Sequence, residues 1–161
     1  TPRDLENNLD VWIIQMALAE SVAARLRKHG FKCKTVEITV RDNGLYSFSR
    51  QMHLRQPTNI TDEIVSAAFQ LFKDNYKWEH PIRSLGIRAA DLVLDDIPVQ
   101  LDLFGNQEKK EKLEKLDRTV DEIRRRFGYF SIQRAAMYQN KVLSHLDVGT
   151  HTVHPHSYFH G

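Results

Sequence analysis

The chain has 161 residues, of which 27% are charged and 41% hydrophobic, and its formal net charge is only +2. This composition is typical of a globular protein with one domain and an appendage, and the net charge alone indicates no class of partner. No apolar run approaches the ~20 residues that a membrane-spanning helix needs, which excludes a helical membrane protein. Thr1-Pro2-Arg3-Asp4 already has the character of a helix start, and Cys33 has no second cysteine to pair with. We therefore expect no signal peptide and a cytoplasmic location.

Residues 4–29 are predicted to form a long amphipathic helix that ends at Gly30. Thr1 is the expected cap, and Pro2 suits the first helical position. The apolar residues of this segment recur every three or four positions and therefore share one face: Leu5, Leu9, Trp12, Met16, Ala19, Ala23 and Leu26. This face is expected to be the buried one.

After Gly30 the period changes to two, which predicts strands over 32–41 and 45–55. Asp42-Asn43-Gly44 lies between them and is typical of a hairpin turn, because Asn and Gly tolerate positive φ. A second helix is predicted over 61–76, with Thr61 as its cap, and a third strand over 82–94. The buried stripe of the second helix is predicted as Ile64, Ala68, Leu71, Phe72 and Tyr76. This order predicts an α+β fold, an antiparallel sheet with two helices on one face.

The opposite face of this sheet is predicted to be polar and positive. Strand alternation assigns to it Thr35, Thr39, Arg41, Ser49, Gln51, His53, Arg55, Ser84, Gly86 and Arg88. The region from Arg25 to Arg55 also has eight Lys or Arg against Glu37 and Asp42. Hydroxyl, amide and guanidinium groups are the usual donors to a nucleic-acid backbone, although an antiparallel sheet can also simply face water. No pair of aromatic residues is expected on this face, which disfavours a platform for stacking unpaired bases.

Three large apolar residues stand in a segment that otherwise has the composition of a linker. Leu101, Leu103 and Phe104 follow Asp95-Asp96-Ile97-Pro98 and precede Gly105-Asn106. An exposed apolar cluster usually marks a surface where another protein docks. The alternative is that these residues extend the last strand of the preceding domain.

Residues 107–127 are predicted to form a charged helix with a narrow apolar seam: Leu113, Leu116, Val120, Ile123 and Phe127. Acid-before-base pairs at a spacing of four favour a helix that lies largely in solvent. A short element of unassigned type is expected over 132–137. The predicted organisation is a sheet domain at 1–97, a linker at 98–106, a charged helical extension at 107–143 and a His-rich tail at 144–161.

No catalytic constellation is found in the sequence. It contains no phosphate-binding glycine loop, no GxSxG and no HExxH. The tail carries His151, His154, His156 and His160, but histidines without a Cys or carboxylate partner set are weak evidence for a metal site. We therefore predict no catalytic residues and no metal ligands.

Five blocks in a fixed order carry a family resemblance: ESVAARLR (20–27), KTV (34–36), FSRQMHL (48–54), PT (57–58) and RSLGIR (83–88). Together they resemble the little finger domain of bacterial Y-family translesion DNA polymerases, the polymerase IV and polymerase V (ImpB/MucB/SamB) kind. The segment QLDLF (100–104) is similar to the sliding-clamp-binding motif of that family. The match covers about two thirds of the chain.

The resemblance implies a set of residues at or near duplex primer–template DNA: Thr35, Ser49, Arg50, Gln51, His53, Arg55, Arg83, Ser84 and Arg88. Thr39 and Arg41 of the polar face complete the predicted DNA-binding set. For the clamp motif, it implies contact with a bacterial sliding clamp through Gln100, Leu101, Asp102, Leu103 and Phe104, with Leu103 and Phe104 in an apolar pocket.

The resemblance also implies what this chain lacks. The palm, fingers and thumb of the family, with their metal-binding carboxylates, have no counterpart here, so this fragment should need no cofactor and should be catalytically silent. The parent protein would be a magnesium-dependent nucleotidyltransferase. The first strand of the family's domain should precede Thr1, which leaves the edge of the strand at 82–94 open and predicts a homodimer or strand exchange.

Two functions of different classes therefore follow. The first is a non-catalytic DNA-binding and clamp-tethering module of a lesion-bypass DNA polymerase. The alternative is a protein-interaction module without DNA contact, which uses the 100–104 motif and the charged helix. A metal-dependent hydrolase that uses the tail histidines is a remote third.

Overall fold

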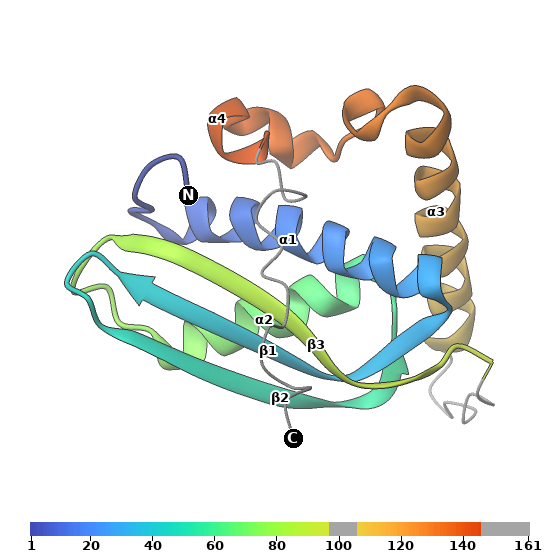
Figure 1. Cartoon of the computed structure of the whole chain (residues 1–161), viewed down its shortest axis with the longest axis horizontal. Coiled ribbons are helices and arrows are strands. Elements are labelled where there is room, and N and C mark those ends of the chain that lie inside the picture. The colour runs from blue at the N-terminus through green and yellow to red at the C-terminus, as the bar shows by residue number, and fades with distance from the viewer. Residues whose placement is uncertain (97–105, 146–161) are drawn as a thin grey trace, which may run out of the picture.

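A computed structural model describes residues 1–96 and 106–145. In these residues a three-stranded antiparallel sheet has the order β2-β1-β3, with β1 (Phe31–Asp42) between β2 (Ser47–Thr58) and β3 (Ile82–Leu94). Helices α1 (Asn8–His29) and α2 (Thr61–Asn75) pack on one face of it (Figure 1). The predicted α+β fold is therefore confirmed. Within the described ranges, no helix has both the length and the apolar character needed to cross a bilayer.

The first helix begins later than predicted. Asn7 is its cap, and the Asn7 side-chain oxygen accepts a hydrogen bond of 2.9 Å from the backbone N–H of Asp10. The preceding residues are not helical, and Leu5 instead exchanges two backbone hydrogen bonds with Ile82, of 2.8 and 2.9 Å. The start at residue 4 and the roles given to Thr1 and Pro2 were therefore wrong, whereas Gly30 ends the helix as expected, with φ 73°.

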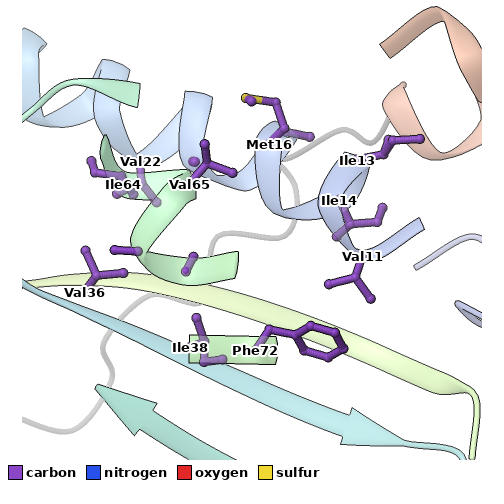
Figure 2. Close-up of a cluster of buried hydrophobic side chains, with 14 of the residues drawn as sticks. Val11, Ile13, Ile14, Met16, Val22, Val36, Ile38, Ile64, Val65 and Phe72 are labelled. Carbon is purple, nitrogen blue, oxygen red and sulfur yellow. The ribbon is translucent and has the colours of Figure 1, made fainter. Parts of the chain in front are cut away.

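Burial of α1 extends around most of the helix. Leu9, predicted to be buried, is 51% exposed, while Ile13, Ile14 and Ala17 are buried although they lie off the predicted stripe. Figure 2 shows Ile14 and Val11 towards the sheet, whereas Ile13 lies on the opposite side, near the C-terminal part of the chain. A helix that is packed on several sides loses a single apolar stripe.

The hairpin closes differently from the prediction. Positive φ occurs at Leu45, at 70°, and not at Asn43 or Gly44. The Asp42 side chain accepts a hydrogen bond of 3.0 Å from the backbone N–H of Tyr46, which closes the loop, and β2 starts at Ser47. The predicted turn position is correct, but the residue that takes the left-handed conformation is not.

The core lies between the sheet and the two helices. Val36, Ile38 and Val40 of β1 are at most 1% exposed. They face the buried stripe of α2, in which Ile64 and Phe72 are also nearly inaccessible (Figure 2). The predicted α2 stripe is confirmed, with Tyr76 only partly buried.

The C-terminal extension, residues 106–145, packs against the sheet domain. It comprises α3 (Asn106–Phe127), two short 3-10 helices η1 (Tyr129–Ser131) and η2 (Ala135–Gln139), and α4 (Lys141–Ser144). Figure 1 shows α3 beside the C-terminal end of α1, after which the chain turns back along α1 on the side away from the sheet. Met137 and Leu143 are buried in the common core.

The predicted apolar seam of α3 is only partly confirmed, since Leu113, Val120 and Ile123 are half-buried. Leu116 and Phe127 are 53% and 74% exposed, whereas Asp117 is buried. The Asp117 carboxylate accepts hydrogen bonds from the Arg27 guanidinium, at 3.1 Å, and from the backbone N–H of Thr61, at 2.9 Å. Asp117 therefore caps α2 from another helix. Thr61 is the first residue of α2 and not its cap.

Candidate nucleic-acid interface

The sheet face opposite α1 and α2 is exposed and polar. Cross-strand pairing aligns its residues in rows across β2, β1 and β3: Ser47–Arg41–Ser84, Ser49–Thr39–Gly86, Gln51–Glu37–Arg88 and His53–Thr35–Ala90. Seven of the predicted DNA-binding residues are exposed members of these rows: Thr39, Arg41, Ser49, Gln51, His53, Ser84 and Arg88. The prediction that they share one face is confirmed, and their contact with DNA stays a prediction.

Gly86 is explained by its cross-strand neighbour. A Cβ atom built on Gly86 would collide with the Thr39 hydroxyl oxygen. The structure gives a reason within the sheet, since the Thr39 side chain already occupies the space beside Gly86.

Comparison with known proteins identifies the family of this chain. Residues 1–103 match the impB/mucB/samB family C-terminal domain. The chain belongs to this family. It is 43% identical over 145 residues to the DNA polymerase IV of Acetivibrio thermocellus, an alignment that covers 90% of this chain and 36% of that protein.

Other relatives give the same picture. The DNA polymerase IV of Pelotomaculum thermopropionicum is 34% identical, over 83% of this chain and 32% of its own length. The DNA polymerase IV 2 of Bacillus subtilis is also 34% identical, over 84% of this chain and 32% of its own length. The chain thus spans about a third of the length of these relatives.

Three residues predicted to bind DNA are not available on the open face of this impB/mucB/samB domain. Thr35 belongs to the face but is only 1% exposed. Arg50 is paired with Ile38 and so lies on the helix side, where its Nε donates to the Asn75 side chain at 3.2 Å. Arg83 lies by the N-terminal segment and forms an ion pair of 3.0 Å with Asp4.

Two carboxylates on the face were missed. Glu37 follows from simple alternation, since it lies between Thr35 and Thr39, and its carboxylate is 3.8 Å from the Arg88 guanidinium. Asp91 could not have been found this way, because its φ of 53° departs from the strand conformation. Arg55 is exposed, at an irregularity in the β1–β2 pairing between Cys33 and Thr35. The face is therefore less positive than predicted.

Arginines of the extension are largely engaged in ion pairs. Arg124 is only 11% exposed and pairs with Glu20 at 3.1 Å, while Arg125 and Arg126 both pair with Glu122. Carboxylates of the chain itself therefore already pair with the three arginines at the end of α3. The family match ends at residue 103, so α3 lies beyond it.

The clamp-motif residues Gln100, Leu101, Asp102, Leu103 and Phe104 lie outside the described residues, as do the histidines of the tail. Within the described part of the chain, no three His, Cys, Asp or Glu side chains come together as a metal-binding group. Burial raises the pKa of the Cys33 thiol to about 11, so this thiol is uncharged at neutral pH.

Proposed function

We propose that this chain is the DNA-gripping and clamp-tethering part of a lesion-bypass DNA polymerase, and that it performs no nucleotidyl transfer itself. In this proposal other segments of the polymerase, with magnesium, carry out the chemistry. An open, low-fidelity active site makes few contacts to its substrate. A separate module then supplies sequence-independent grip through phosphates, and a clamp-binding peptide raises the local concentration of the enzyme.

The observation that carries the DNA half of the proposal is the exposed polar face. Arg41 and Arg88 are exposed, and hydroxyl or amide groups of Thr39, Ser49 and Gln51 lie between them in the sheet. Both helices pack on the other side, so neither of them covers this face, and its exposed side chains can reach a flat, repetitive ligand. A phosphate backbone is such a ligand, and it is bound without regard to base sequence.

The full chain should bind a duplex of arbitrary sequence weakly and with a steep dependence on salt. Each phosphate neutralised contributes a slope of about −0.9 in a plot of log affinity against log salt, so the cations on this face predict a slope of roughly −2 to −4. Fluorescence anisotropy with a labelled duplex, between about 50 and 200 mM salt, measures it. No binding at low salt would support the alternative, a protein-interaction module.

The clamp half of the proposal is tested by Leu103→Ala combined with Phe104→Ala. Loss of two apolar anchors should weaken binding to a bacterial sliding clamp by roughly 100-fold or more and leave duplex binding unchanged. Surface plasmon resonance with immobilised clamp measures this effect, with Leu116→Ala, an exposed leucine of α3, as the matched control. Loss of clamp and duplex binding together would instead mean that these residues belong to the sheet domain's core.

The expected homodimer or strand exchange stays a prediction. In the described residues, the outer edge of β3 is paired only at Ile82, with Leu5. The rest of that edge presents backbone groups on which another strand could pair.

A further inference from the structure

One residue from each strand takes part in a short hydrogen-bonded chain on the open face. The Thr35 hydroxyl of β1 is 2.8 Å from the Nδ1 atom of His53 on β2. The same hydroxyl donates to the carboxylate of Asp91 on β3, at 2.5 Å. Thr35 is 1% exposed, so it is enclosed by the network, whereas His53 and Asp91 are exposed.

The direction of each proton in this network follows from the groups that form it. A threonine hydroxyl has one proton to donate, and a carboxylate can only accept. A separation of 2.5 Å is in the range of a charge-assisted O–H···O⁻ bond, so the Thr35 proton points to Asp91. The Thr35 oxygen can then only accept from His53, which therefore carries a proton on Nδ1.

This arrangement decides what the other ring nitrogen of His53 can offer a ligand. With the proton of neutral His53 held on Nδ1, Nε2 presents a lone pair and cannot donate to a phosphate. Protonated His53 presents an Nε2–H donor and a positive charge. We propose that Asp91, acting through Thr35, is a positioning residue that makes His53 a proton-dependent phosphate donor, so that the chain grips duplex DNA more tightly as the pH falls.

The charged groups that neighbour the network along the strands are mixed in sign. Among the described residues, Glu37 and Lys34 of β1, Arg55 of β2 and Arg88 of β3 lie near the network along the strands. Their field does not decide which nitrogen of neutral His53 holds the proton, because the hydrogen bond to Thr35 sets that. Both α1 and α2 lie under the opposite face.

The first test needs no DNA. NMR of the imidazole nitrogens in the full chain should show neutral His53 as the Nδ1–H tautomer. In Asp91→Asn the side-chain amide can donate as well as accept, so Thr35 can turn its proton towards His53 and a mixture of tautomers is expected. Thr35→Ser should restore the single tautomer that Thr35→Val abolishes. A dominant Nε2–H tautomer in the wild-type chain would overturn the inference.

The second test rests on the proposed function. Anisotropy with a labelled duplex at constant ionic strength is followed from about pH 8 to about pH 5.5, where imidazoles titrate. As the pH falls over this range, the duplex affinity of the wild-type chain should increase by a factor roughly five times larger than that of His53→Gln, whose side chain cannot gain a proton. An equal pH dependence in the two proteins overturns this inference alone. If neither binds the duplex at any pH, the proposed function itself fails.

Discussion

Replacing Arg27 with Met should lower the free energy of unfolding by about 3–5 kcal/mol, because it leaves buried acceptors without their cation. The Arg27 side chain is 4% exposed. Its guanidinium donates to the Asp117 carboxylate at 3.1 Å, to the Asp121 carboxylate at 2.6 Å and to the Asn59 carbonyl at 2.7 Å. These bonds join α1 to α3 and to the start of α2, so the loss should loosen the C-terminal extension as well.

The free energy of unfolding lost in Arg27→Met should depend on pH, and the direction follows from Asp117. Burial raises the pKa of this carboxyl, and the Thr61 backbone N–H and the Arg27 charge act in the opposite direction. Because the pKa of Asp117 is higher in the folded chain than in the unfolded chain, the folded chain binds this proton more tightly. Proton binding at Asp117 therefore stabilises the fold in acid, and this stabilisation is lost as the pH rises through the folded pKa. Without Arg27 the pKa of Asp117 rises further, so the penalty should be smaller in acid than at neutral pH.

Denaturant unfolding of the full chain at about pH 5 and about pH 7.5 measures both effects. Arg118→Met on α3 is the matched control, because Arg118 also pairs with carboxylates, those of Asp95 and Glu114, but its side chain is 48% exposed. The control should cost less than about 1 kcal/mol at either pH. Equal costs for the two variants, or a penalty for Arg27→Met that does not change with pH, would show that the buried network does not hold α3 in place.

Charge reversal on the sheet face should have the largest effect on DNA binding. The combined variant Arg41→Glu and Arg88→Glu removes two expected phosphate contacts and adds repulsion. Duplex affinity at low salt should fall on the order of 100-fold, and the salt slope should become shallower by about two units. Because the Arg88 side chain is 61% exposed, its replacement should not disturb the fold.

The matched control is Arg125→Glu combined with Arg126→Glu, which changes the net charge equally. These two arginines are 68% and 62% exposed on α3, away from the sheet face. This control variant should have a salt slope within about half a unit of the wild-type value. If both double variants lose affinity equally, binding follows net charge and the sheet face has no special role.

The open face shows how far local pattern carries a prediction of the site. Alternation along β1 and β2 is local, and it correctly gathers Thr39, Ser49 and Gln51 on one face. Arg50 was included by family resemblance against that alternation, and it lies on the helix side. Asp91 reaches Thr35 from a left-handed backbone conformation that no periodicity in the sequence indicates.

The amino-acid sequence by itself determined the α+β class, the order of the elements and which side of the sheet is polar, because strand and helix periods are properties of neighbouring residues. Only the tertiary structure decided that α3 docks through Asp117, that α1 is buried on several sides and that Thr35 is enclosed by His53 and Asp91. Each of these depends on residues far apart in the chain. Burial and hydrogen-bond partners are set where such segments meet, and a local pattern does not contain that information.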